Sequence, residues 1–373
     1  MNIQVDPVPP AKRRPKPKDE SALGFGRIYS DHMFTVEWNE AEGWHNARIG
    51  AYRNLDLPPA ALVLHYGQTI FEGLKAYRAA DGGFNLFRPD QNIRRFNASA
   101  ARLDMPQVPP ELVMEAIEGL MALDHGWVPR SAGTSLYIRP TMIATEPYIG
   151  LKSSGQFLFF IITGPVGAYY PEGFNPVRIQ VCERYSRAGP GGLGAVKTAA
   201  NYAASLLAEK EAKKAGFTQV LWLDASERRY VEEVGSMNIL FKIGGTVVTP
   251  PLGGTILPGI TRDSALRLLR SWEVPVEERP VSIDEVIAAH GNGTLEEVFG
   301  SGTAAVIAPV GLLCYRGSNY EIGDGRTGAL ARRLFDELTG IQYGQQPDRF
   351  DWLVRLDPAQ KNASTPTVSR LAL

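Results

Sequence analysis

The sequence predicts a two-domain protein of mixed helices and strands, an α/β fold of the α+β type. Its 373 residues are enough for two domains with sizeable cores. Segments typical of strands are interspersed with segments typical of helices in both halves of the chain. A stretch rich in Gly, Pro and Tyr that has no period, residues 165–176, separates the two halves and predicts a linker.

These patterns predict four regions: a mobile tail over residues 1–22, a smaller N-terminal α/β domain over 23–164, the linker over 165–176, and a larger C-terminal domain over 177–373. The tail combines prolines with the basic run Lys12-Arg13-Arg14, a composition typical of unfolded chain. Its prolines, together with Asp19 and Glu20, argue against a mitochondrial presequence.

The first domain contains clear local signals. Strands are expected over residues 34–38, 135–144 and 156–163, and a hairpin is expected with arms 74–79 and 84–88 around Asp81-Gly82-Gly83. Pro89 opens a helix that is expected to reach residue 103, because proline is favoured at the first helical position. A second helix is expected over residues 111–123.

The second domain begins with an expected strand over residues 177–183. An Ala-, Leu-, Glu- and Lys-rich helix follows over residues 199–215 and ends at Gly216. Later elements are expected as strands over residues 219–223 and 238–243, a Gly244-Gly245 turn, a helix from about Ile260 and a strand that reaches Phe299. The segment from Gln345 onward has no assignable pattern.

Composition excludes several classes of function. The net charge of −1 gives no strong field for nucleic acid or an anionic membrane, and no apolar run is long enough to span a membrane. The two cysteines, Cys182 and Cys314, are too few for a disulfide framework, which suits a reducing cytoplasm. The five histidines lack ligand spacing, so no metal is expected; His65 is expected in the core of an apolar strand.

Two segments resemble nucleotide-binding motifs, but each lacks a feature that its motif requires. Residues 192–198 resemble a P-loop, but Val196 stands where the glycine before the lysine is needed. Residues 300–305 resemble a dinucleotide fingerprint, but Pro309 falls where the required helix would continue. Both glycine-rich stretches still offer backbone amides for a phosphate group.

The most informative stretch is residues 189–202, in which a glycine-rich loop delivers Lys197 to the start of a helix and Tyr202 follows five residues later. An amine near a helix N-terminus meets the positive end of the helix dipole, and burial adds a desolvation cost. Both effects favour the neutral amine, which is the form that attacks a carbonyl group.

The chain also has partners for each part of a pyridoxal phosphate cofactor. Lys197 suits an imine and Tyr202 a phenolate oxygen, while either Glu232 or Glu233 suits a ring nitrogen. Residues 258–261 and 300–303 offer amides and hydroxyls to the phosphate. Because neighbouring strand residues face opposite ways, only one of the two glutamates is expected to point into a site.

Several motifs resemble those of the branched-chain amino acid aminotransferases, which belong to the class IV, fold-type IV pyridoxal phosphate enzymes. The resemblance runs in order from about Phe25 to beyond Arg332. It is carried by Phe71-Glu72-Gly73-Leu74-Lys75, Asn92-x-x-Arg95, Ser99-Ala100-x-Arg102-Leu103, Tyr137-Ile138-Arg139-Pro140, Lys197-Thr198-Ala199-Ala200-Asn201-Tyr202, Glu233-Val234-Gly235-Ser236-Met237-Asn238, Pro250-Pro251-Leu252 through Thr261-Arg262, and the segment from Gly300 to Ala304. It implies that the larger domain is a pseudo-barrel and that the cofactor is pyridoxal 5′-phosphate.

The resemblance also implies roles for individual residues. Lys197 would carry the cofactor as a Schiff base and act as the acid and base of the reaction. Glu233 rather than Glu232 would pair with the pyridinium nitrogen. The implied cofactor-binding residues are Arg95, Lys197, Tyr202, Glu233, Leu257, Ile260, Thr261 and Thr303. The implied substrate-binding residues are Phe25, Tyr66, Phe71, Tyr137, Arg139, Tyr169, Ser236, Thr303 and Ala304.

The implied reaction moves the amino group of leucine, isoleucine or valine to 2-oxoglutarate by ping-pong kinetics, and Tyr137 and Arg139 would bind the distal carboxylate of glutamate. Ile149 and Leu151 lie in a loop that crosses into the partner subunit's site in relatives, which implies a homodimer. Some animal relatives carry a redox Cys-x-x-Cys motif where this chain has Ala305 and Ala308, so no thiol switch is expected here.

Three alternatives remain open. The first keeps the fold and changes the reaction, to that of a D-amino acid transaminase, an (R)-amine transaminase or an aminodeoxychorismate lyase. The second is a nucleotide-binding protein that uses the glycine-rich loops. The third is a structural relative without a cofactor. The Tyr137-x-Arg139 pair and the run 233–238 favour the branched-chain reaction.

Overall fold

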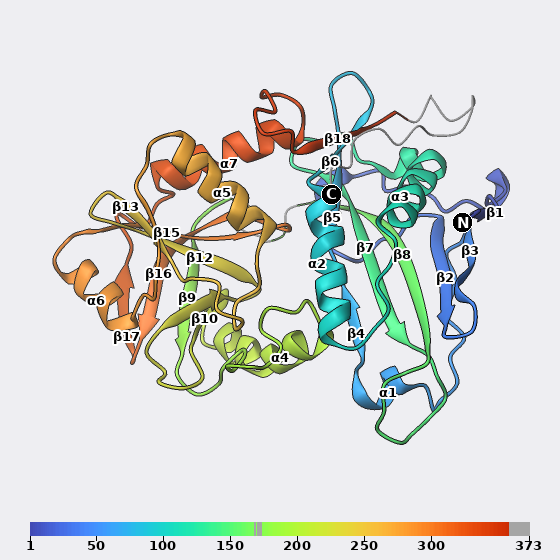
Figure 1. Ribbon diagram of the computed structural model, residues 1–373. Helices are drawn as coiled ribbons and strands as arrows, with labels where there is room; N and C mark the ends of the chain where they lie inside the picture. Colours follow the sequence, from blue (N-terminus) through green and yellow to red (C-terminus); the bar gives the residue numbers. More distant parts are fainter. Residues whose placement is uncertain (168, 170–173, 358–373) are drawn as a thin grey trace. The chain divides into compact units, whose positions relative to one another are not determined.

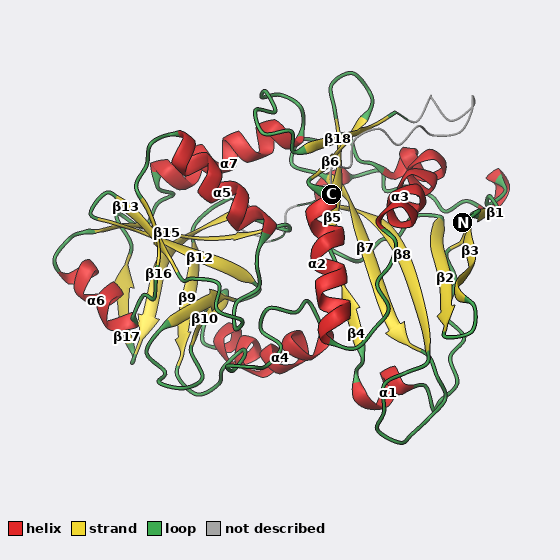
Figure 2. Ribbon diagram, viewed as in Figure 1, coloured by secondary structure: helices red, strands yellow, loops and turns green. Residues whose placement is uncertain are grey.

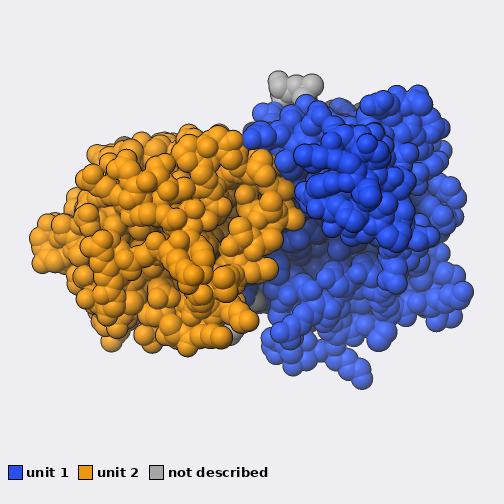
Figure 3. Space-filling model, turned by 90° about the horizontal axis from the view of Figure 1, so that it is seen from below, with its two compact units in different colours: residues 1–169, 341–373 blue, residues 170–340 orange. Residues whose placement is uncertain are grey.

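The computed structural model describes residues 1–167, 169 and 174–357 (Figure 1). The described chain forms two compact units: unit 1 comprises residues 1–169 and 341–373, and unit 2 comprises residues 170–340, apart from the residues outside the described ranges (Figure 3). The predicted linker lies partly outside those ranges. Its first two residues belong to a strand, because Pro165 and Val166 continue the pairing of β8 with β7.

Unit 1 is built on a sheet that is antiparallel except at one edge. Its strand order is β1-β3-β2-β8-β7-β5-β6-β18, and β4 pairs with β7. Only the β1–β3 pair of the described sheet is parallel. The strands are β1 Gln4–Val5, β2 His32–Asn39, β3 Gly43–Ala51, β4 Thr69–Phe71, β5 Leu74–Arg78, β6 Phe84–Phe87, β7 Ser135–Ala144, β8 Gln156–Val166 and β18 Leu353–Leu356.

Three α-helices accompany this sheet: α1 Leu62–Tyr66, α2 Pro89–Arg102 and α3 Pro110–Asp124. Figure 2 shows α2 and α3 along one face of the sheet. Pro89 begins α2, and the helix buries the face that contains Ile93, Phe96 and Ala100. The ring of Phe96 meets that of Phe159 on β8 edge to face, with centroids 5.3 Å apart. The predicted hairpin and both predicted helices are confirmed.

Unit 2 is built on a sheet that closes into a barrel. The strand order is β11-β10-β9-β16-β15-β12-β13-β14 with β17 beside β16, and a further β11–β12 pairing joins the ends of a six-strand ring. The strands are β9 Val177–Cys182, β10 Gln219–Leu223, β11 Val231–Val234, β12 Met237–Ile243, β13 Thr246–Thr249, β14 Val276–Glu278, β15 Leu295–Gly302, β16 Val306–Tyr315 and β17 Ser318–Glu321. This ring confirms the pseudo-barrel expectation.

The helices of this part of the chain are α4 Ala199–Lys214, α5 Ile260–Ser271, α6 Ile283–Gly291 and α7 Ala329–Gln342, whose last two residues belong to unit 1. The α4 helix ends as its composition predicts. Gly216 has a φ of +83°, and the amide of Phe217 reaches back to the carbonyl of Ala212 at 3.0 Å. Both buried cysteines, Cys182 and Cys314, are unpaired thiols.

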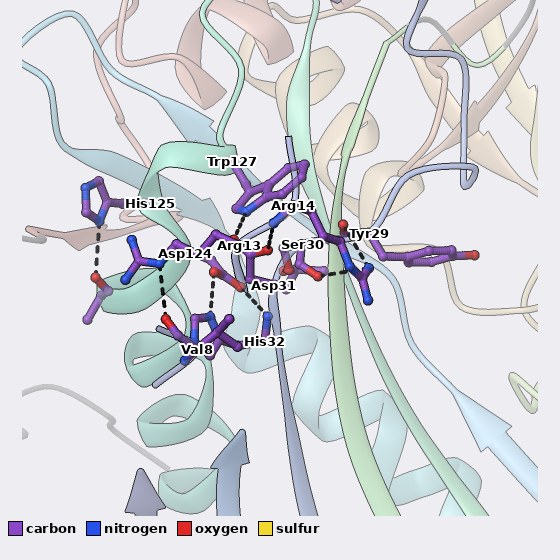
Figure 4. A network of polar contacts seen from close by, with 12 residues as sticks. Val8, Arg13, Arg14, Tyr29, Ser30, Asp31, His32, Asp124, His125 and Trp127 are labelled. Atoms are coloured by element: carbon purple, nitrogen blue, oxygen red, sulfur yellow. Dashed lines mark hydrogen bonds and ion pairs between the residues drawn. The ribbon is translucent and has the colours of Figure 1, made fainter. Parts of the chain in front are cut away.

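The N-terminal residues, expected as a mobile tail over residues 1–22, contact the sheet of unit 1 in the structure. The β1 strand pairs with β3, and the Val8 amide donates to His32 Nε2 at 2.9 Å in a buried position (Figure 4). The other ring nitrogen of His32 lies 2.7 Å from Asp124 Oδ1. The Arg14 amide donates to Asp31 Oδ1 at 2.8 Å. These contacts hold the segment against the sheet although its composition is typical of unfolded chain.

Two further expectations differ from the structure. Residues after 340 were expected in the larger domain, but β18 pairs with β6 and therefore joins the sheet of unit 1. His65 was expected in a buried apolar strand. It lies instead in the short helix α1 and is exposed, with its Nε2 atom 2.9 Å from the carbonyl oxygen of Pro59.

Candidate active site

Lys197 and Tyr202 contact each other at the start of α4. The Lys197 Nζ atom donates to the Tyr202 hydroxyl at 2.8 Å. The loop before the lysine, residues 189–196, is called here the Lys197 loop. Asn201 in the first turn of the helix donates to two carbonyls of this loop, those of Leu193 and Val196, both at 2.8 Å. The loop therefore has a fixed path, and it delivers the amine to the phenol.

The Lys197 loop packs against the segment that leads into α5, residues 254–259, called here the α5-entry loop. The Ala195 amide donates to the Gly254 carbonyl at 3.0 Å. A Cβ atom on Gly194 would collide with the backbone of Thr255, so this position requires glycine. The close approach of these two backbones explains why a glycine-rich sequence precedes the lysine.

Glu233 lies on β11 and is almost completely buried, at 2 % exposure. One carboxylate oxygen accepts from the Leu257 amide at 2.7 Å, and the other lies 2.7 Å from Arg187 Nε. Burial raises the pKa of Glu233 to about 7, and the positive charges of Arg187 and Lys197 oppose that rise. Lys197 and Glu233 are thus close enough to act on each other electrostatically.

The neighbouring Glu232 is also buried, and burial likewise raises its pKa. Its Oε2 atom has no hydrogen-bond partner among the described residues. The two glutamates differ in their surroundings: Glu233 accepts from the Leu257 amide and is influenced by Lys197, whereas Glu232 bonds to the Thr255 side chain and is influenced by the acidic Asp224. Arg187 lowers the pKa of both. This difference favours Glu233 among the two alternatives that the sequence left open.

The start of α5 offers backbone amides. The helix begins at Ile260, and its N-cap residue Gly259 has no side chain that could cap it. Thr261 in its first turn is buried. Thr303 and Ala304 are half-buried in the turn that joins β15 to β16, and Ser236 is exposed in the turn between β11 and β12. An uncapped helix start of this kind suits a phosphate group.

In unit 1, Arg95 is buried on α2 and pairs with Glu72. Its Nε atom lies 2.6 Å from Glu72 Oε1, and its Nη2 atom lies 3.0 Å from Oε2. Asn92 also donates to Glu72 Oε2, at 2.8 Å. The adjacent Arg94 is exposed. Burial therefore distinguishes Arg95 from Arg94 as a candidate ligand, which the composition of the helix does not.

A second part of unit 1 is a cavity of about 180 Å³ whose wall includes Phe25, Tyr137 and Arg139. Arg139 Nη2 donates to the Tyr137 hydroxyl at 3.1 Å, and the Phe25 ring meets the Tyr137 and Tyr169 rings edge to face. Arg139 also lies over the ring of Phe71, 4.7 Å from its centroid. The Nε atom of Arg139 is buried and has no hydrogen-bond partner among the described residues, which suits the binding of an anionic ligand.

The residues expected at a subunit boundary lie together at the surface of unit 1. Ile149 and Leu151 are exposed, and the Tyr66 hydroxyl donates to the Ile149 carbonyl. The structure thus brings some of the expected site residues into contact, in two sets: Phe25, Phe71, Tyr137 and Arg139 in unit 1, and Lys197 with Tyr202 and Glu233 with Leu257 in unit 2.

Sequence reasoning missed three residues of these sets: Glu72, Arg187 and Asn238. Asn238 Nδ2 donates to the Leu257 carbonyl at 2.9 Å. Glu72 and Asn238 lie inside the recognised motifs, which was the available signal for them. Arg187 stands ten residues before Lys197 outside any quoted motif, and its sequence neighbourhood carries no such signal.

The family model described as amino-transferase class IV matches residues 69–313. The chain belongs to the class IV aminotransferases. This class IV aminotransferase is 52% identical over 357 residues to branched-chain-amino-acid transaminase 1 of Bacillus subtilis (strain 168), covering 95% of this chain and 100% of the relative. It is 48% identical over 339 residues to the branched-chain-amino-acid aminotransferase of Mycolicibacterium smegmatis, covering 90% and 92%.

Solved structures agree with this membership. The branched-chain amino acid aminotransferase of Escherichia coli matches with a TM-score of 0.71 and 27% identity, over 85% of this chain and 98% of the other. A second solved branched-chain amino acid aminotransferase, from T.th. and with pyridoxamine 5′-phosphate, matches with a TM-score of 0.71 and 27% identity, over 86% and 97%. None of the helices in the described ranges is long and apolar enough to cross a membrane.

Proposed function

We propose that this class IV aminotransferase is a branched-chain-amino-acid transaminase, which moves the amino group of leucine, isoleucine or valine to 2-oxoglutarate and yields glutamate. The observation that carries the proposal is the contact of the Lys197 amine with the Tyr202 phenol beside a buried Glu233 carboxyl. Relatives at about half identity that bear this name support the choice of substrate. The Tyr137–Arg139 pair supports it over other reactions of the same fold.

The residues of unit 2 fit pyridoxal 5′-phosphate. They provide an amine for its aldehyde, a phenol for its ring oxygen, a buried carboxyl for its ring nitrogen and an uncapped helix start for its phosphate. We assign these parts to Lys197, Tyr202 and Glu233, with Ile260 and Thr261 at the helix start. Leu257 and Thr303 are the other cofactor-binding residues proposed in unit 2. Arg95 of unit 1 is proposed as a further phosphate ligand. When bound, this cofactor supplies an electron sink for the pair of electrons that a Cα–H bond leaves behind.

The chain's own residues then move and hold protons. Lys197 Nζ takes the proton from Cα of the amino acid and would pass it to the former aldehyde carbon of the cofactor. In the reverse half-reaction it would move a proton from that carbon back to Cα. The Tyr202 hydroxyl holds that amine in place, since it accepts its hydrogen bond at 2.8 Å. The Glu233 carboxylate holds a proton at the ring nitrogen, because a buried anion stabilises a positive charge beside it.

The aromatic residues are proposed to bind the aliphatic side chain of the substrate. Phe25, Phe71, Tyr66 and Tyr169 offer apolar surface. Tyr137 and Arg139 bind the distal carboxylate of glutamate, for which the unpartnered Arg139 Nε is suited. Ser236 and the backbone of Thr303 and Ala304 are proposed to receive the substrate near its α-carboxylate. No metal ion takes part in this scheme.

A homodimer is proposed as the working unit, with Ile149 and Leu151 reaching the partner subunit's site. Their exposure, at 69% and 83%, supports this surface as a place of contact. We place the enzyme in the cytoplasm, where amino acids and their 2-oxo acids are exchanged, without nucleic-acid or membrane partners.

The proposal is tested with the purified protein and a panel of amino donors. L-Leucine, L-isoleucine and L-valine should be consumed with 2-oxoglutarate, with parallel initial-rate lines. Lys197→Ala should lose nearly all turnover, and Lys210→Ala on the exposed side of α4 serves as the matched control. Preference for D-alanine over L-leucine would support the alternative of a D-amino acid transaminase. Full activity of Lys197→Ala would overturn the mechanism.

A further inference from the structure

The Arg187 side chain joins three segments of unit 2 that carry the proposed cofactor site. Its Nε atom lies 2.7 Å from Glu233 Oε2. Its Nη1 atom donates to the Thr255 carbonyl at 2.8 Å, and its Nη2 atom donates to the Gly194 carbonyl at 3.0 Å. The side chain is only 8% exposed, so these contacts are shielded from water. One guanidinium thus connects β11, the α5-entry loop and the Lys197 loop.

These contacts belong to a larger set that fixes the α5-entry loop. The Leu257 amide donates to Glu233 at 2.7 Å, and its carbonyl accepts from Asn238 at 2.9 Å. Glu233 and Asn238 are directly opposite each other on β11 and β12. Both polar groups of the Leu257 backbone are therefore held by one cross-strand pair, and Arg187 holds the same loop two residues earlier. A shift of the Glu233 carboxyl would require the loop to shift with it.

Arg187 also acts on the charge of Glu233. The groups that bear on this carboxyl are the positive Arg187 and Lys197 and the negative Glu232. Burial raises the pKa of Glu233 to about 7, and Arg187 is the largest of the influences that lower it. Loss of the guanidinium would leave burial and Glu232 opposed only by Lys197 and the Leu257 amide, so the pKa would rise further.

We propose that Arg187 is a positioning residue, which directs the Glu233 carboxyl, favours its ionised form and ties the Lys197 loop and the α5-entry loop to it. Arg187 acts through Glu233 and the two loops. Its importance for catalysis rests on the proposed function, in which Glu233 holds a proton at the cofactor's ring nitrogen. Its effect on Glu233 itself does not depend on which substrate the enzyme takes.

The test measures the free energy of unfolding of the full chain in urea, without added cofactor and at one protein concentration, at pH 5.5 and pH 8.5. The variants are Arg187→Met, Arg187→Lys and Arg187→Met/Glu233→Gln, with the exposed Arg184→Met as matched control. A carboxyl whose pKa is higher in the folded state stabilises the fold at low pH and loses this contribution as the pH rises. At pH 5.5 Glu233 is protonated with or without Arg187. Arg187→Met should therefore lower the free energy of unfolding at this pH only through lost packing and hydrogen-bond contacts.

At pH 8.5 Arg187→Met should lower the folding equilibrium constant by at least ~10-fold more than at pH 5.5, since each unit of pKa corresponds to a tenfold factor. Glu233→Gln in the same chain should remove most of this extra loss, and the remainder reports on Glu232, whose pKa Arg187 also lowers. Arg187→Lys should show a smaller extra loss than Arg187→Met, because it returns a positive charge. Equal losses at the two pH values would overturn the proposal and leave Arg187 a packing residue.

A second measurement separates this proposal from the proposed function. In the loaded enzyme, Arg187→Met should lower kcat for L-leucine at least ~10-fold while KM changes little, because Glu233 acts on the reacting system rather than on the substrate side chain. A fall confined to KM would contradict the inference. If the wild-type protein fails to use L-leucine, the proposed function is overturned, and the pH-dependent unfolding still decides the effect of Arg187 on Glu233.

Discussion

Each unit contains a buried arginine–glutamate pair, and the two pairs are built differently. In unit 1 the Arg95 guanidinium meets both oxygens of Glu72, which also accepts from Asn92 and from the Gly73 amide. In unit 2 Arg187 meets one oxygen of Glu233 and sends its other nitrogens to two backbone carbonyls. Glu72 is thus surrounded by donors of its own unit, whereas Glu233 has one protein donor on each oxygen.

The difference teaches that burial of an ion pair does not by itself indicate a catalytic role. A carboxylate has about four acceptor positions. Glu72 uses most of its positions within unit 1, so its pair with Arg95 connects the segment between β4 and β5 to α2. The Glu233 carboxyl retains positions for a further donor, as a partner of a ring nitrogen must.

The largest expected effect is on stability, from Glu72→Gln. This substitution leaves Arg95 buried without its counter-charge, which costs about 3–5 kcal/mol in comparable pairs. Urea unfolding measures the loss, and Glu40→Gln in the exposed turn after β2 serves as control. A loss below about 1 kcal/mol would show that Glu72 contributes little to the stability of unit 1. The contrast between the two ion pairs would then fail.

The next effect is on catalysis, from Glu233→Gln. An amide keeps the shape of the side chain but cannot hold a proton at the ring nitrogen, so kcat for L-leucine should fall ~100-fold or more. Glu232→Gln is the matched control and should reduce kcat less than about threefold, because that carboxyl is held by neither Arg187 nor Leu257. Equal effects of the two substitutions would contradict the assignment of Glu233.

The third prediction concerns the protonation of Glu233. In the protein without cofactor this carboxyl should titrate near pH 7, protonated below and ionised above, because burial raises its pKa to about 7. Its stabilising contribution is therefore present at low pH and lost as the pH rises from about 4.5 to about 7. Infrared difference titration of wild type against Glu233→Gln would detect it. A midpoint below pH 5 would show that Arg187 outweighs burial.

The smallest expected effect comes from Tyr202→Phe. The phenylalanine keeps the ring but removes the acceptor of the 2.8 Å bond from Lys197, at a cost of about 1–1.5 kcal/mol or roughly tenfold in kcat. Steady-state kinetics with L-leucine measures the change, and Tyr185→Phe, whose hydroxyl faces Glu211, is the control. An unchanged kcat would mean that the Lys197 loop alone positions the amine.

Local signals predicted much of the fold. Pro89 and Gly216 mark real helix ends because capping and allowed dihedral angles act within a few residues. The hairpin around residues 81–83 likewise depends on neighbours in the chain. The family motifs named Lys197, Tyr202 and Glu233, and each of these lies in an environment that suits its proposed role.

Long-range pairing escaped the sequence analysis. The β18 strand joins β6 from the far end of the chain, and the N-terminal segment depends on His32 and Asp124, so neither carries a local pattern. His65 was misread because Leu62 and the residues after it look equally apolar as a strand or as a short helix. Arg187 was missed since Glu233 and the Thr255 carbonyl are distant from it in sequence, and the nearer Gly194 carbonyl belongs to the backbone, which carries no side-chain pattern.

The docking of the first residues has a practical consequence for shortened forms of this enzyme. The imidazole of His32 receives the Val8 amide on one nitrogen and presents the other to Asp124, and it is fully shielded from water. Trimming the chain before residue 14, as its composition invites, would strip the donor from a buried acceptor and uncover the edge of β3. Affinity tags are therefore better appended ahead of Met1 than substituted for the opening segment.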